Sequence, residues 1–430
     1  MQLRIEKLIY GGDGLARLAA DERGPGKSVF VPFVLEGELA EAELTENKPG
    51  FARARLERVL EPSDSRITAA CPYFQHCGGC HYQHTNYEQQ VDIKATILRE
   101  TLRRTAKMEL PCQLQVHPSP PWNYRNRTRL KVSPSPEFAV GYHRFRSHEL
   151  LPVEQCPISS PLINKALQAM WASGRAGQAG EEVREIEFFA DNRDASLLME
   201  ARCAPRTSRQ VARRTAEMLK AIMPEVAGVA VFEQERPGQM PHAAKLAEFG
   251  AGQLMYHTQL CPYRVSAGSF FQVNRFLVDE LVASVTSGLQ GDLALDLYAG
   301  VGLFAVALAR SFAQVIAVEA SQTSFADLRH NAAPEVRAVQ ATTEQYLRQA
   351  SGRSPDLVVA DPPRGGLGEN VVRGLARLGP TRMVYVSCDP STLARDLRIF
   401  ADLGYRIEAA HLLDLFPQTY HIETVFHLAR

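Results

Sequence analysis

The chain has 430 residues, which is too long for a single hydrophobic core and predicts two or three domains. Apolar residues make up 45% of it and charged residues 22%, a composition typical of a soluble globular protein. Its 48 basic and 48 acidic side chains give a net charge of zero, which argues against a protein that coats nucleic acid through bulk charge. A local basic patch is compatible with this balance.

The sequence contains no stretch that is apolar for long enough to span a membrane, and its first residues lack the apolar run of a signal peptide. We therefore expect a cytoplasmic protein with no membrane partner. In that compartment its eight cysteines are expected to bind a metal or take part in catalysis rather than form disulfides.

Residues 1–61 predict a small closed β-barrel. Short strands are expected at residues 3–8, 29–34, 38–44 and 52–60. Glycines and a Pro-Gly pair between these segments supply the turns. Closely spaced short strands of this kind are typical of barrels that bind oligonucleotides, although the many glutamates predict that only part of the surface contacts RNA.

A group of cysteines follows the barrel. The candidate metal ligands are Cys71, Cys77, Cys80 and, far downstream, Cys156. Three cysteines spaced by five and by two residues, with two glycines before the third, let a loop wrap around a compact centre that a fourth thiolate completes. The spacing alone leaves an iron–sulfur cluster and a zinc ion equally open. Zinc could also recruit a nearby histidine: His76, His81 or His84.

The middle of the chain alternates helices and strands and predicts an α+β domain. Apolar spacing predicts an amphipathic helix over residues 87–105, which is expected to pack on the catalytic domain. Further helices are expected near residues 161–171 and 207–221, and strands near 184–190 and 195–201.

Basic residues alternate with other residues in the segment 122–132. The members of this stripe are Arg125, Arg127, Arg129 and Lys131. In a strand, alternation places them on one face, where they form either a solvated surface or a line of phosphate contacts. Because four adjacent like charges repel one another, we favour contact with RNA.

Polar residues stand at the ends of successive predicted strands in the carboxy-terminal half. The strand 293–297 leads into Tyr298 and a glycine turn, the strand 314–318 ends in Glu319, and the strand 356–360 leads into Asp361. In an open α/β sheet, ligands bind beyond the carboxyl ends of the strands, and an acidic residue after the second strand can accept hydrogen bonds from ribose hydroxyls. The pattern predicts a site for a nucleoside cofactor such as S-adenosylmethionine.

A further apolar run, residues 384–387, ends at Cys388, and a helical pattern begins at once after it. A buried cysteine is more often a small apolar side chain than a nucleophile. At the end of a parallel strand, however, a thiol faces the ligand, and we expect the positive end of the following helix dipole to favour its thiolate.

Several motifs together resemble those of the RNA uracil-5-methyltransferases, over essentially the whole chain. They are the spaced cysteines, FFQVN, LDLYAGVG, VEAS, DPPRGG, VSCDPSTLARDL and FPQTYHIETV. More narrowly the chain resembles the iron–sulfur, TRAM-domain branch that acts on 23S ribosomal RNA. The resemblance implies an α/β multidomain fold: a TRAM barrel at 1–61, a central domain at 62–260 with a [4Fe-4S] cluster on the four cysteines, and a class I Rossmann-like methyltransferase domain at 261–430.

The resemblance also implies a chemistry. The thiolate of Cys388 adds to carbon 6 of uracil and makes carbon 5 nucleophilic, the methyl group of S-adenosylmethionine is transferred, and Glu423 removes the carbon 5 proton so that the thiolate can leave. The implied cofactor-binding residues are Gln272, Tyr298, Glu319 and Asp361, the last of which is also expected near the uracil. A target reached by a buried thiol must be flipped or unpaired. Leu303 departs from the polar residue of several relatives, so no cofactor contact is expected there.

Three alternatives follow from the same residues. The RNA substrate is expected to be ribosomal, with the T-loop of tRNA as the second choice. A non-catalytic RNA-binding protein is disfavoured because Cys388 and Glu423 are both present. An amino-group methyltransferase is disfavoured because Arg364 stands where an aromatic residue would stack on the base. We expect a monomer with no obligate protein partner.

Overall fold

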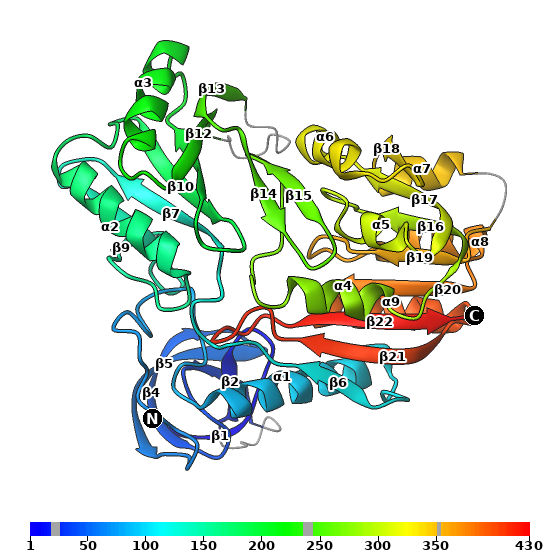
Figure 1. Cartoon of the computed structure of the whole chain (residues 1–430). Coiled ribbons are helices and arrows are strands. Elements are labelled where there is room, and N and C mark those ends of the chain that lie inside the picture. Colours follow the sequence, from blue (N-terminus) through cyan, green and yellow to red (C-terminus); the bar gives the residue numbers. More distant parts are fainter. Residues whose placement is uncertain (19–25, 235–243, 351–353) are drawn as a thin grey trace.

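The computed structural model describes residues 1–18, 26–234, 244–350 and 354–430. Its strands form a closed barrel, a seven-stranded sheet, a two-stranded hairpin and an eight-stranded sheet. In Figure 1 the barrel lies below the seven-stranded sheet, and the eight-stranded sheet with its helices lies beside both.

The predicted amino-terminal barrel is confirmed, with strand order β1-β2-β3-β5-β4. Its strands are β1 (Gln2–Leu8), β2 (Asp13–Arg17), β3 (Ser28–Pro32), β4 (Leu39–Asn47) and β5 (Phe51–Glu61). β3 and β5 are parallel and the other pairs are antiparallel. Alternate residues such as Leu3 and Ile5 face the interior, as the period of two along a strand requires.

The seven-stranded sheet has the order β13-β12-β11-β10-β7-β8-β9. Its strands are β7 (Arg127–Ser133), β8 (Ala139–His143), β9 (Leu150–Pro152), β10 (Val183–Ala190), β11 (Leu197–Cys203), β12 (Val226–Glu233) and β13 (Lys245–Gly250). The helices α2 (Pro161–Arg175) and α3 (Arg209–Lys220) contribute their apolar sides to the same core. A hairpin of β14 (Gln253–His257) and β15 (Pro262–Ser266) follows.

The eight-stranded sheet has the order β18-β17-β16-β19-β20-β22-β21-β6. Its strands are β6 (Leu114–His117), β16 (Gly291–Leu297), β17 (Phe312–Glu319), β18 (Val336–Gln340), β19 (Leu357–Ala360), β20 (Arg382–Ser387), β21 (Arg406–Leu413) and β22 (Glu423–Ala429). The strands β18, β17, β16, β19 and β20 are parallel, and β22 is antiparallel to both of its neighbours. β19 is buried along its whole length, as expected for a parallel strand between layers of helices.

The helices in the carboxy-terminal part of the chain are short. They are α4 (Val278–Thr286), α5 (Leu303–Leu308), α6 (Gln322–Asn331), α7 (Thr343–Gln349), α8 (Gly368–Leu378) and α9 (Pro390–Asp402). None of the helices in the described ranges is both long and apolar enough to cross a membrane.

One helix and one strand from the middle of the chain join the carboxy-terminal layers. The helix α1 (Tyr87–Thr101), which continues as a π-helical turn (Leu102–Ala106), shares a core with α9 through residues such as Leu98 and Leu397. β6 pairs with β21 at the edge of the eight-stranded sheet. Figure 1 shows α1 lying between the barrel and β6.

Candidate active site

Four of the predicted site residues follow neighbouring strands of the large sheet. Tyr298 follows β16, Glu319 ends β17, Asp361 follows β19 and Cys388 follows β20. These strands are adjacent and parallel in the order β17-β16-β19-β20. Their carboxyl ends therefore place the four residues along one edge of the sheet, where ligands bind in such folds.

Glu319 and the glycine turn after β16 are joined by hydrogen bonds. The Glu319 carboxylate accepts from the backbone N–H of Gly300 at 2.8 Å and of Ser321 at 2.6 Å. Gly302 has a φ of 94°, and an added Cβ would lie 2.8 Å from Leu328 Cδ1, so both the turn and the packing require glycine. This arrangement fixes a carboxylate beside a tight turn that a ligand can approach closely.

Two aspartates of adjacent strand segments lie close together here, Asp296 buried and Asp361 half-buried. Burial raises the pKa of Asp361 to about 7. Asp296, inside β16, is fully buried, and burial and the nearby Asp361 raise its pKa well above the usual range. Asp296 was not predicted as a site residue, although a carboxylate within an otherwise apolar strand is a signal that could have identified it.

Gln272 approaches from a different segment, between β15 and α4. The backbone carbonyl of Val273 accepts a hydrogen bond from Asn126, and Asn274 forms an isolated bridge with Arg125. The Gln272 side chain is half-buried. The structure thus anchors the backbone directly after Gln272.

Cys388 and Glu423 lie opposite each other. Ser387 of β20 pairs with Thr424 of antiparallel β22, so the next pair outward consists of Cys388 and Glu423. Glu423 is 7% exposed, and burial followed by the neighbouring Asp361 raises its pKa well above the usual value. The register therefore brings together a thiol and a carboxyl group that are 35 residues apart in the sequence.

The expectation that a helix dipole favours the Cys388 thiolate is wrong for this structure. Burial raises the pKa of the thiol to about 12, and the negative charges of Glu423 and Asp361 act in the same direction. The N-terminus of α9 is already occupied: the Asp389 carboxylate accepts from the N–H groups of Ser391 at 2.9 Å and Thr392 at 3.0 Å. Burial and the two acidic neighbours thus favour the neutral thiol over the thiolate.

Arg364 is the cation that faces this group of acids. Its charge opposes the rise in the pKa of both Cys388 and Glu423. Its guanidinium lies 3.3 Å from both ring nitrogens of His421. Burial, and then Arg364, lower the pKa of His421 to about 3, so this imidazole is neutral.

The barrel reaches the same site through Tyr10, which sequence reasoning missed. The Tyr10 hydroxyl donates to the backbone carbonyl of Cys388 at 3.4 Å, and its ring packs edge-on against Tyr420 with centroids 5.5 Å apart. A groove of about 580 Å³ between the barrel and α1 extends from Tyr10 to Ser391, with Arg17 and Arg104 in its lining. No periodicity or motif marks Tyr10, because its role depends on how the barrel docks.

The four predicted metal-ligand cysteines come together. Cys71, Cys77, Cys80 and Cys156 line one cavity. The half-buried Arg125 also lines it, and its buried Nε has no hydrogen-bond partner among the described residues. Within the described residues, however, no group of three or more His, Cys, Asp or Glu side chains is arranged to hold a metal ion.

The basic stripe is largely paired with carboxylates, and its contact with RNA stays a prediction. Arg127 pairs with Glu187 and lies 3.1 Å from Glu200, and Arg129 lies 2.6 Å from Glu187. Lys131 pairs with Glu185, and the half-buried Arg125 lies beside the cysteines. The argument from repulsion failed because glutamates of β10 and β11 pair with Arg127, Arg129 and Lys131.

Comparisons with known proteins agree with this architecture. A model of the TRAM domain matches residues 1–56, and a model described as tRNA (uracil-5-)-methyltransferase matches residues 86–430. An uncharacterized RNA methyltransferase of Aquifex aeolicus is 32% identical over 99% of this chain and 97% of its own length. The 23S rRNA (uracil(1939)-C(5))-methyltransferase RlmD of Pseudomonas putida is also 32% identical, over 99% of this chain and 92% of its own.

A solved structure shares the fold. The Pyrococcus abyssi tRNA (uracil-54, C5)-methyltransferase, in complex with S-adenosyl-L-homocysteine, superposes with a TM-score of 0.77 over 100% of both chains, at 23% identity. The identity is too low to carry more than the fold. With the family model covering four-fifths of the sequence and relatives matching along its full length, this chain belongs to the RNA (uracil-5-)-methyltransferase family.

Proposed function

We propose that this RNA uracil-5-methyltransferase uses Cys388 as its nucleophile and Glu423 as its general base. One observation carries the proposal: the register of β20 and β22 sets a thiol and a buried carboxyl group opposite each other, at the strand ends that bind ligands. Asp361 is the third acidic group of this cluster.

The cofactor is S-adenosylmethionine, which supplies an activated methyl group on a sulfonium. Tyr298 and Glu319 follow neighbouring strands, and Gln272 enters from the segment before α4. The Glu319 carboxylate is fixed by two backbone N–H groups and still has lone pairs to accept from ribose hydroxyls. These three residues, with Asp361, form the proposed cofactor site.

The Cys388 thiol first gives its proton to the neighbouring Asp361 carboxylate, which leaves the thiolate that attacks carbon 6 of the uracil. The thiolate then forms a bond to carbon 6, the pair of electrons from the ring double bond becomes available at carbon 5, and carbon 5 takes the methyl group. Glu423, as a carboxylate, removes the proton from carbon 5, the double bond reforms, and the carbon–sulfur bond breaks. Arg364 supports both ionised forms because its charge lowers the pKa of each group.

The substrate we propose first is a uridine of large-subunit ribosomal RNA, with the T-loop of tRNA second. The relative named RlmD supports the former, and its similarity to this chain extends along almost the whole of both proteins. Mapping 5-methyluridine in ribosomal and transfer RNA from cells with and without the gene separates the two. Loss of the modification from tRNA alone would overturn the ribosomal assignment.

We also propose that Cys71, Cys77, Cys80 and Cys156 hold a [4Fe-4S] cluster, which belongs to the branch the chain resembles. Four thiols that line one cavity, together with the half-buried Arg125 guanidinium, fit an anionic centre. A zinc site with histidine fits less well. In the described part of the chain, no histidine lines this cavity, and the His84 ring lies 3.3 Å from the Val34 carbonyl instead.

The test of the proposed activity is transfer of a labelled methyl group to RNA from a strain that lacks the gene. Cys388→Ala should abolish transfer and any covalent protein–RNA adduct while the protein still binds S-adenosylmethionine. Cys112→Ala, which removes a half-buried thiol from the same half of the fold, is the matched control and should retain activity. Turnover by Cys388→Ala would refute the nucleophile, and no transfer by the unmodified protein to any RNA would favour a binding role.

A further inference from the structure

The segment 414–422 connects β21 to β22 and delivers Glu423 to the active site. It begins with Asp414, which is 1% exposed, and it contains the buried Gln418 and Thr419. His421, the neighbour of Arg364, lies near its end. The position of this segment therefore bears on where the proposed base stands, and through His421 the segment also contacts Arg364.

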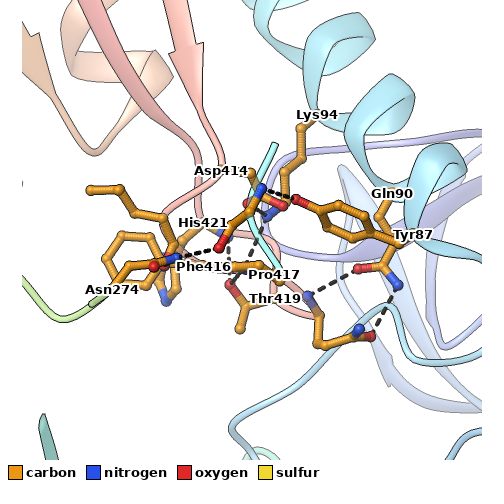
Figure 2. A network of polar contacts seen from close by, with 12 residues as sticks. Tyr87, Gln90, Lys94, Asn274, Asp414, Phe416, Pro417, Thr419 and His421 are labelled. Atoms are coloured by element: carbon orange, nitrogen blue, oxygen red, sulfur yellow. Dashed lines mark hydrogen bonds and ion pairs between the residues drawn. The ribbon is translucent and has the colours of Figure 1, made fainter. Parts of the chain in front are cut away.

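Lys94 of α1 contacts the segment at two points. Its ammonium donates to Asp414 Oδ1 at 2.6 Å and to the backbone carbonyl of Phe416 at 2.9 Å. Both charged side chains are fully buried. Figure 2 shows Lys94 reaching from its helix to these two groups, with the Tyr87 ring beside them.

A buried ion pair is a poor source of stability, because removing two charges from water costs about as much as their attraction returns. The presence of the Lys94–Asp414 pair therefore needs an explanation other than stability. The Phe416 contact suggests one, since the ammonium holds the backbone of the segment as well as the Asp414 side chain.

Other parts of the chain hold the neighbouring carbonyls. Leu415 O accepts from Asn274 at 3.1 Å, Pro417 O accepts from Tyr124 at 3.0 Å, and Gln418 O accepts from the backbone N–H groups of His81 and Tyr82. Gln90, one helical turn before Lys94, is bonded to the Gln418 backbone and side chain. The four successive carbonyls of residues 415–418 thus each accept a hydrogen bond from a donor outside the segment. Among these donors, Lys94 is the one that carries a charge.

We propose that Lys94 is a positioning residue for Glu423, because its buried ammonium fixes the segment from which the base enters the active site. This inference rests on the proposed function of Glu423. Displacement of the segment moves the carboxylate relative to carbon 5, whereas Cys388, on β20, keeps its place. Attack and methyl transfer should then continue, while removal of the carbon 5 proton slows.

The predicted signature is a methylated covalent adduct. In Lys94→Met, turnover should fall at least tenfold while the KM values for RNA and S-adenosylmethionine change less than about threefold. Single-turnover reactions with labelled methyl donor should show a protein–RNA band that survives denaturation and carries the label. Lys165→Met, which removes a surface lysine paired with Glu225, is the matched control and should show neither effect.

A second variant separates the effect of Lys94 on protein stability from its effect on the position of Glu423. Lys94→Met leaves Asp414 buried without its partner and should lower the melting temperature, whereas Lys94→Met with Asp414→Asn removes both charges and should recover most of it. The double variant still lacks the bond to Phe416 O and should still accumulate the adduct. Normal turnover in a double variant of recovered stability would overturn the inference and leave the pair a structural one.

Glu423→Gln in the same assay distinguishes the two levels of the proposal. An adduct with Glu423→Gln but none with Lys94→Met overturns the positioning role alone. Normal turnover of Glu423→Gln overturns the base assignment and, with it, the role of Lys94.

Discussion

The buried Cys388 thiol should react slowly with alkylating agents in the free protein. Its pKa of about 12 leaves about one molecule in ten thousand as thiolate at pH 8. An ordinary thiol with a pKa of about 8.5 is about one-quarter ionised at that pH, which is roughly 2,000-fold more. A more basic thiolate is a better nucleophile. With a Brønsted slope of about 0.4–0.5, its higher reactivity offsets roughly fortyfold of this difference in thiolate fraction. The net expectation is alkylation about fifty- to sixtyfold slower than for an unperturbed thiol.

Iodoacetamide labelling followed by peptide-resolved mass spectrometry measures this rate for Cys388 alone. The same cysteine in the urea-unfolded protein is the internal control. In the native protein the logarithm of the rate should rise with unit slope from pH 7 to beyond pH 10, whereas in the unfolded protein it should level off above about pH 8.5. The slope separates a raised pKa from simple shielding, which would slow the reaction equally at every pH.

Arg364→Met extends the test to the cause of the shift. Because Arg364 lowers the pKa of Cys388, its removal should slow labelling further at pH 8. Glu423→Gln removes a negative charge and should speed it up. A native rate that levels off below pH 9, or equal labelling of native and unfolded protein, would refute the electrostatic reasoning.

Three further predictions concern the base, the cysteines and the basic stripe. Glu423→Gln should trap the methylated protein–RNA adduct, seen as a labelled band in denaturing gels; normal turnover would place the base elsewhere. Cys156→Ser should remove iron and sulfide from anaerobically prepared protein, whereas Cys203→Ser, outside the cavity, should retain them; zinc without iron in the parent protein would reject the cluster. Glu187 has its pKa lowered to about 2 despite burial, because Arg127 and Arg129 stabilise its charge. The ionised Glu187 therefore stabilises the fold above pH 4.5, and this stabilisation is lost as the pH falls toward 2. Glu187→Gln should therefore lower the unfolding free energy by about 2–3 kcal/mol at pH 6 and by much less at pH 2.5, as measured by denaturant titration; an equal loss at both pH values would contradict the ion-pair account.

The amino-acid sequence by itself determined the barrel, the parallel strands of the catalytic half, and the residues that stand at their ends. These features depend on local patterns: alternation within a strand, an apolar run, a glycine turn, and a polar residue where the strand stops. Because parallel strands place their carboxyl ends at one edge, the grouping of Tyr298, Glu319, Asp361 and Cys388 followed without knowledge of distant contacts.

Only the tertiary structure decided which partner each charged side chain has. The bases of β7 are paired with glutamates of β10 and β11, more than fifty residues away in the sequence, so the stripe is not the unpaired row of like charges that the sequence suggests. The N-terminus of α9 is taken by Asp389, which leaves the Cys388 thiol in a buried, acidic site with a raised pKa. Strand register and domain docking set these contacts, and the burial and partners of a charged group depend on the whole fold rather than on its neighbours in the chain.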